Sequence, residues 1–229
     1  LHLLSRRQRQ MCIRDSINFN ENALGMSPSA QSAARDAVAK GNRYAKAEIT
    51  QLHGKLCDMY KVPKNFLLLT DGSSEGIRAL MGAYSRLPKV QLVIPELTYG
   101  DGADVAKRNN IPVKNVKMGP NWSIDLAALR KVATAEAKKH RVLVYLVNPN
   151  NPTSTIADSN EIFNWIKSQP KNTFFILDEA YAEFVNDPSF KSCNELVRQG
   201  FDNLVVLKTF SKIFAMAGMR LGYAVGAVN

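Results

Sequence analysis

Hydroxyl groups and a second cation surround Lys212 in the stretch KTFSKIFAMAGMRLGY, residues 208–223. Thr209 and Ser211 precede the lysine, and Arg220 follows it. Hydroxyl and guanidinium groups bind phosphate well, arginine as a two-pronged donor. A lysine amine is a poor nucleophile at its ordinary pKa of about 10.4, but burial near a cation such as Arg220 favours the free amine. The pattern indicates a nucleophilic amine beside a phosphate site, with a solvated surface lysine as the alternative.

A pair of carboxylates follows another apolar run, in FFILDEAYAEF. Asp178 and Glu179 end the run, and Tyr181 lies three residues beyond Asp178. Because a buried, unpaired carboxylate is costly, we expect Asp178 to meet a cation, a metal or several N–H donors. Magnesium in a nucleotide-hydrolysing site is a competing interpretation, although the chain has no P-loop to support it.

Two further loops carry polar side chains directly after apolar runs. In LLLTDGSSEGIRAL, Ser73 and Ser74 open a helix whose free N–H groups and dipole suit a phosphate, although an ordinary helix cap is the simpler interpretation. In LVNPNNPTSTI, two prolines stiffen a turn and hold Asn151, whose amide could donate to an oxyanion. A plain turn is the alternative for the second loop.

Short apolar runs alternate with longer amphipathic segments, which predicts an α/β fold with a mainly parallel sheet and helices on both faces. The expected strands are residues 66–70, 90–95, 142–147, 173–178, 203–208 and 221–226. Amphipathic segments over residues 73–87 and 158–168, and charged segments over 30–40 and 126–141, are expected to be helices. Ligands of such sheets bind beyond the carboxyl ends of the strands, which is where all four polar groups lie.

Composition excludes several classes of protein. The chain has 229 residues, of which 45% are hydrophobic and 22% charged, which is typical of a globular protein. No apolar run approaches the roughly 20 residues of a membrane-spanning helix. The net charge of +10 is scattered over the expected helices rather than clustered, which favours a solvated surface over a nucleic-acid site. Three cysteines without CxxC spacing argue against disulfides and zinc and favour a reducing, cytoplasmic compartment.

One ligand accounts for all four sites, since pyridoxal 5′-phosphate carries a phosphate, a phenolic oxygen, a protonatable ring nitrogen and an aldehyde that reacts with an amine. The motifs NENALG, NRYAKAE, NPNNPT, DEAYAEF and TFSKIFAMAGMRLGY resemble those of the class I/II aminotransferases, closest to the histidinol-phosphate aminotransferase branch. The resemblance extends from Ile17 to Asn229. It implies the large domain of a fold type I transferase, a three-layer α/β/α structure.

The resemblance also implies a role for each matching residue. Lys212 would form a Schiff base with the cofactor and later move the proton between the substrate Cα and the cofactor. Asp178 would pair with the ring nitrogen and keep it protonated, so that the ring accepts electrons. Asn151 and Tyr181 would bind the phenolic oxygen, and Tyr99 would stack on the ring. The phosphate would be bound by Ser73, Ser74, Thr209, Ser211 and Arg220.

Substrates and subunit structure follow from the same resemblance. An amino acid or histidinol phosphate would give its amine to the cofactor and a keto acid would take it, as a step of amino-acid biosynthesis. Tyr44 matches the tyrosine that reaches the phosphate of a neighbouring subunit, which implies a homodimer. A decarboxylase with the same fold, or a non-catalytic regulatory module, is the alternative, and the donor and acceptor are left open.

Two departures from the family pattern carry expectations of their own, and in addition RYAKAE, residues 43–48, lacks the proline and aspartate that are common after the tyrosine matching Tyr44. Ser154 stands where the family usually has glycine, which we expect to tighten the turn and keep the Asn151 contact. The family's C-terminal small domain, with the arginine that clamps the substrate carboxylate, is expected to be missing after residues 17–229. Residues 1–16 resemble translated sequencing-adapter sequence, so the native amino terminus and any export signal are left open.

Overall fold

The structure is a computed structural model that describes residues 19–227. The tail predicted over residues 1–16 therefore lies outside the described residues. The strands are β1 Leu67–Thr70, β2 Val90–Pro95, β3 Val113–Val116, β4 Arg141–Val147, β5 Thr173–Asp178, β6 Leu204–Thr209 and β7 Gly222–Gly226. The α-helices are α2 Pro28–Val38, α3 Lys46–Tyr60, α4 Ser73–Tyr84, α5 Asp101–Arg108, α6 Leu126–Glu136, α7 Ser159–Lys167 and α8 Asn194–Arg198. Short 3-10 helices are η1 Lys64–Phe66, η2 Pro120–Trp122, η3 Ala182–Phe184 and η4 Ala217–Met219.

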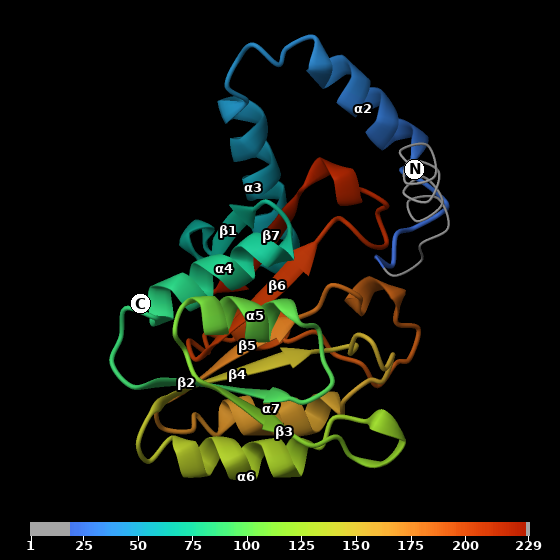
Figure 1. Ribbon diagram of the computed structural model, residues 1–229. Helices are drawn as coiled ribbons and strands as arrows, with labels where there is room; N and C mark the ends of the chain where they lie inside the picture. Colours follow the sequence, from blue (N-terminus) through green and yellow to red (C-terminus); the bar gives the residue numbers. More distant parts are fainter. Residues whose placement is uncertain (1–18, 228–229) are drawn as a thin grey trace, which may run out of the picture.

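Within residues 19–227 the strands form one seven-stranded sheet in the order β1-β7-β6-β5-β4-β2-β3. The pairs among β3, β2, β4, β5 and β6 are parallel, whereas β7 runs antiparallel to both β6 and β1. Helices cover both faces, with α4 and α5 on one side and α6 and α7 on the other (Figure 1). The predicted three-layer α/β/α fold is confirmed.

Alternate side chains of each strand enter two different cores, because successive residues of a strand point to opposite faces. Ile176 of β5 packs in the core beneath α4 and α5, and Leu177 packs in the core formed with α3, α6, α7 and α8. Both side chains are essentially inaccessible to water. This alternation decides which face each functional side chain reaches at the strand ends.

The six strands predicted from apolar runs are confirmed within one residue or so at each end. The short edge strand β3 was missed because its sequence, VKNV, is half polar. The helix expected over residues 126–141 ends at Glu136 instead, and Arg141 already belongs to β4. Long, buried runs were therefore easier to predict than an exposed edge.

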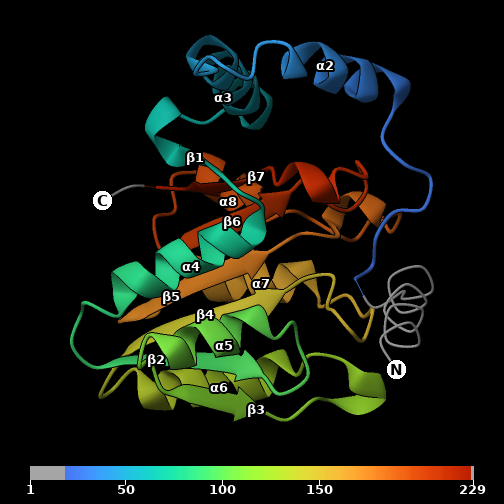
Figure 2. The same ribbon diagram turned by 45° about the horizontal axis from the view of Figure 1, so that its top comes forward.

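The amino-terminal arm, residues 19–45, begins against the layered body and then projects away from it at α2 (Figure 2). Its helix α2 buries none of its residues, and Tyr44, in the link to α3, is fully exposed. Across the described part of the chain, no helix is long and apolar enough to cross a bilayer.

Candidate functional site

A cavity of about 270 Å³ opens beyond the carboxyl ends of β4, β5 and β6 and is also bounded by α4 and the arm. Ten of the residues singled out in the sequence line it: Ser73, Ser74, Tyr99, Asn151, Asp178, Tyr181, Thr209, Ser211, Lys212 and Arg220. These residues come from stretches up to about 150 residues apart in the chain. Tyr44 is not among the residues that line this cavity.

The amino terminus of α4 and Arg220 form a part of the cavity that can bind an anion. Gly72, with a φ of 78°, caps the amino terminus of α4, whose first N–H groups have no helical partner. A Cβ on Gly72 would come within 2.5 Å of the Arg220 guanidinium, and a Cβ on Gly222 would come within 2.7 Å of the Gly72 backbone. The two glycines therefore let the helix terminus and the arginine approach each other closely. The positive end of the α4 dipole and the Arg220 guanidinium can therefore attract the same anion.

Hydroxyl groups line the same part of the cavity. The Thr209 hydroxyl donates to the Ser211 hydroxyl at 2.8 Å, and Arg220 Nη1 donates to the same Ser211 oxygen at 3.4 Å. The Ser74 hydroxyl is engaged differently, since it donates to Asp101 at 2.9 Å. Tyr99 donates to the same Asp101 oxygen at 3.0 Å. Asp101 was not expected from the sequence, and it links α4 to the aromatic wall of the cavity.

Lys212 lines the same cavity as these anion-binding groups. Its Nζ donates to the Phe19 carbonyl oxygen at 2.7 Å and lies 5.6 Å from the centroid of the Tyr181 ring. Asn20 of the arm in turn donates to the Tyr181 hydroxyl at 3.0 Å. The arm thus covers the amine in this structure. Phe19 and Asn20 were missed as site residues because their partners, Lys212 and Tyr181, lie 193 and 161 positions later in the chain.

The cavity is also lined by a buried carboxylate. Asp178 is 2% exposed, and its oxygens accept hydrogen bonds from the Tyr145 hydroxyl at 2.9 Å and the Ala180 N–H at 3.2 Å. Burial raises the pKa of Asp178 from 3.8 to about 6, although both hydrogen bonds act in the opposite direction. A cationic N–H would be the partner that stabilises this carboxylate most.

The raised pKa makes ionised Asp178 costly for the fold without a ligand. The folded chain holds this proton more tightly than the unfolded chain, so the cost is fully present above pH 6 and fades as the pH falls towards 3.8. Asp178→Asn is expected to raise the free energy of unfolding of the ligand-free chain at pH 8 by about 2 to 3 kcal/mol. Near pH 4 the gain should almost vanish. Urea unfolding at both pH values measures this change in the free energy of unfolding, and Asp36→Asn, at an exposed position, is the control. A gain that does not depend on pH would contradict the raised pKa of Asp178.

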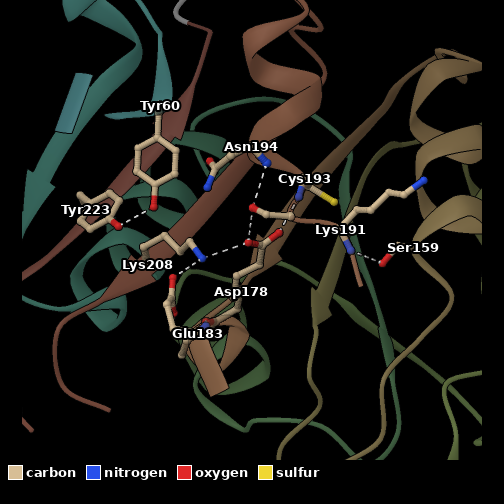
Figure 3. A network of polar contacts seen from close by, with 12 residues as sticks. Tyr60, Ser159, Asp178, Glu183, Lys191, Cys193, Asn194, Lys208 and Tyr223 are labelled. Atoms are coloured by element: carbon tan, nitrogen blue, oxygen red, sulfur yellow. Dashed lines mark hydrogen bonds and ion pairs between the residues drawn. The ribbon is translucent and has the colours of Figure 1, made fainter. Parts of the chain in front are cut away.

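Glu179, the neighbour of Asp178, faces the opposite side of the sheet. It pairs with the buried Lys208 at 3.2 Å and accepts from the Ser192 hydroxyl and the Cys193 N–H. Glu183 also pairs with Lys208, at 2.6 Å (Figure 3). Burial lowers the pKa of Lys208, but the attraction of both carboxylates outweighs it and leaves this pKa above its ordinary value. The network secures the segment on both sides of Tyr181.

The magnesium interpretation loses its basis, because strand alternation separates the two carboxylates of the Asp-Glu pair. Asp178 lines the cavity, whereas Glu179 forms an ion pair with Lys208. In residues 19–227, no cluster of three or more histidine, cysteine or acidic side chains could hold a metal ion.

Amide side chains hold the loop that carries Asn151. Asn150 accepts from Thr98 at 2.8 Å and donates to the Leu97 carbonyl at 3.0 Å, which ties the loop to the segment before Tyr99. Ser154 has a φ of 56°, the left-handed region that favours glycine, as the family's glycine would suggest. The Asn151 amide lies 3.5 Å from the Tyr181 hydroxyl. Both side chains therefore converge on one point of the cavity.

Comparisons with known proteins agree with this geometry. The sequence matches the family Aminotransferase class I and II over residues 14–229. A curated histidinol-phosphate aminotransferase from Symbiobacterium thermophilum is 36% identical over 220 residues, which cover 95% of this chain and 58% of the relative. The crystal structure of an Erwinia carotovora atroseptica protein, provisionally assigned as a histidinol-phosphate aminotransferase, is 57% identical with a TM-score of 0.88, covering 92% of this chain and 60% of that one.

The fold recurs in a more distant structure. The histidinol-phosphate aminotransferase of Sinorhizobium meliloti, solved with pyridoxal-5′-phosphate, superposes with a TM-score of 0.80 at 23% identity, covering 90% of this chain and 54% of that one. The present chain therefore spans a little over half the length of these relatives.

Proposed function

Because the chain belongs to the class I and II aminotransferases, we propose that it forms the cofactor-binding part of a transaminase that uses pyridoxal 5′-phosphate. The observation that carries this proposal is one cavity that is lined by the groups of an anion site, by the buried Asp178 carboxylate and by Lys212. The curated relatives are named histidinol-phosphate aminotransferases. We therefore propose an amino acid or histidinol phosphate as donor and a keto acid as acceptor.

The residues present fit the cofactor. The space that Gly72 and Gly222 keep open beside Arg220 suits the phosphate, together with the α4 terminus, Thr209 and Ser211. The buried Asp178 carboxylate requires a cationic partner, which a protonated ring nitrogen provides.

The remaining contacts would be made to the ring of the cofactor. Asn151 and Tyr181 converge where a phenolic oxygen would accept hydrogen bonds, and Tyr99 forms the aromatic wall for stacking. When bound, pyridoxal 5′-phosphate supplies an aldehyde that accepts the donor's amine and a ring that draws electrons from the donor's Cα.

The chain's own residues would bind the cofactor, move the proton and stabilise the charge on the ring. Lys212 would hold the cofactor between reactions and would move the proton at the donor's Cα during them. Asp178 holds the proton on the ring nitrogen by offering a negative charge in a site shielded from water. Phe19 accepts a hydrogen bond from the Lys212 amine, and Asn20 donates one to the Tyr181 hydroxyl, so the arm contacts both side chains.

Product analysis tests the reaction type. The chain loaded with pyridoxal 5′-phosphate is mixed with histidinol phosphate, glutamate or an aromatic amino acid, and the keto product and carbon dioxide are measured together. We expect keto product and pyridoxamine phosphate in equal amounts, without carbon dioxide. Carbon dioxide in place of keto product would establish the decarboxylase alternative. Cofactor binding without either product would contradict transamination by this chain.

We further propose a homodimer in which Tyr44 completes the phosphate site of the neighbouring subunit. An arm whose helix α2 buries nothing and whose Tyr44 is fully exposed supports this proposal, because such a segment needs a partner surface. The buried, unpaired thiols of Cys57 and Cys193 agree with a reducing compartment, and we propose the cytoplasm.

Mixed dimers test the role of Tyr44. Tyr44→Ala should lose cofactor affinity, and Lys212→Ala should lose covalent attachment, when each is studied alone. In an equal mixture of the two, about a quarter of all sites should be native again, because one subunit supplies Lys212 and the other Tyr44. Covalent attachment after reduction with borohydride counts the restored sites. No gain over the separate variants, with subunit exchange verified, would contradict the shared site.

A further inference from the structure

Tyr145 carries the one hydroxyl group among the buried side chains of β4. Its neighbours in the strand, residues 142–147, are otherwise valine and leucine, and the tyrosine itself is 0% exposed. Phenylalanine would fill the same space and would need no hydrogen-bond partner. The buried hydroxyl therefore calls for an explanation beyond packing.

The hydroxyl is directed at the carboxylate of the candidate site. Tyr145 and Asp178 lie on the paired strands β4 and β5, where Tyr145 is opposite Ile176, and alternation brings both side chains to the same face. The Tyr145 hydroxyl donates to Asp178 Oδ2 at 2.9 Å, while the Ala180 N–H holds Oδ1 at 3.2 Å. Each carboxylate oxygen thus has its own donor, and the orientation of the carboxylate plane is determined.

Helix α5 holds the Tyr145 ring in place. A Cβ on Gly102 would come within 2.7 Å of ring atoms Cδ1 and Cε1, so the helix backbone packs directly against the ring. Gly102 and Tyr145 are both buried. The ring cannot swing away from Asp178 unless α5 moves, which makes the hydroxyl a fixed donor.

We propose that Tyr145 is a positioning residue that orients the Asp178 carboxylate towards the ring nitrogen of pyridoxal 5′-phosphate and favours its charged form. This proposal rests on the proposed function. Desolvation opposes the charge of Asp178, and nearby Asp101 and Glu179 oppose it further, whereas the Tyr145 and Ala180 hydrogen bonds support it. Loss of the hydroxyl should therefore weaken whatever Asp178 does to the ring nitrogen and leave the phosphate and phenolic contacts intact.

A pair of cofactors separates this effect from general damage to the fold. The full chain is titrated with pyridoxal 5′-phosphate and with its deaza analogue, in which carbon replaces the ring nitrogen. The wild-type chain should prefer the natural cofactor. Tyr145→Phe should reduce that preference by about tenfold, since a hydrogen bond to a charged group is lost. The matched control is Tyr84→Phe, a half-buried tyrosine that packs on Phe174.

A variant that combines Tyr145→Phe with Asp178→Asn completes a double-mutant cycle. In an Asp178→Asn background, Tyr145→Phe should change neither dissociation constant further, because its effect passes through the carboxylate. If Tyr145→Phe weakens both cofactors equally, or neither, while its melting curve shows a folded chain, the Tyr145 proposal is wrong and the proposed function stands. If the wild-type chain binds neither cofactor, the proposed function fails and the Tyr145 proposal with it.

Discussion

Replacing Lys212 with alanine is expected to lower the rate of amine transfer by at least about 10³-fold, the largest effect of any single change in this chain. The variant loses the amine that we propose anchors the cofactor and moves the proton at the donor's Cα. The anion site and Asp178 remain, so pyridoxal 5′-phosphate should still bind without a covalent bond. Single-turnover formation of pyridoxamine phosphate from an amino donor measures the rate.

Two variants sharpen this prediction. Lys212→Arg keeps the positive charge but cannot form the covalent bond, and it should be as inactive as Lys212→Ala. Lys107→Ala removes an exposed lysine of α5 and should leave the rate unchanged. If Lys212→Ala keeps more than about a tenth of the native rate, another group supplies the amine and the proposed role of Lys212 is wrong.

The second large effect is expected at Arg220. This residue adopts a φ of 50°, donates to the Asp71 carbonyl at 3.0 Å and lies against the Gly72 backbone. We propose that its guanidinium binds the cofactor phosphate with the α4 terminus. Arg220→Met should therefore weaken pyridoxal 5′-phosphate by about 10- to 100-fold, the effect of losing a charge-assisted hydrogen bond.

Pyridoxal without its phosphate provides the internal control. Its affinity should be the same for the wild-type chain and Arg220→Met, because the lost contact is to the phosphate alone. Arg78→Met, at an exposed position of α4, should bind both compounds like the wild-type chain. Equal weakening of pyridoxal and its phosphate by Arg220→Met would mean that the arginine supports the loop rather than the ligand.

The parts of the fold that could be predicted from the sequence are those with a strong local pattern. The runs that became β2, β4, β5 and β6 are almost wholly buried, and such continuous apolar segments have few alternatives. Strand β3 was missed because it has only one buried residue. Residue types at the strand ends likewise predicted Lys212 and Asp178, since polar groups after a buried strand have to meet at one edge of the sheet.

The residues that could not be predicted act through contacts between distant elements. Tyr145 looks like any aromatic residue of a buried strand, and only the register of β4 with β5 brings its hydroxyl to Asp178. Glycine is needed at position 72 because the Arg220 guanidinium approaches its backbone closely, and Arg220 lies almost 150 residues later in the chain. Lys208 and Glu179 carry charges into the core, and only their pairing across the sheet allows it.

Covalent attachment of the cofactor tests the central claim most directly. The chain is mixed with pyridoxal 5′-phosphate and reduced with borohydride, and the modified peptide is mapped by mass spectrometry, with Lys212→Ala as control. We predict one stable adduct, on Lys212, and none at that peptide in the control. Labelling spread over several lysines, or no labelling, in a chain whose circular dichroism shows that it is folded, would contradict the proposed site.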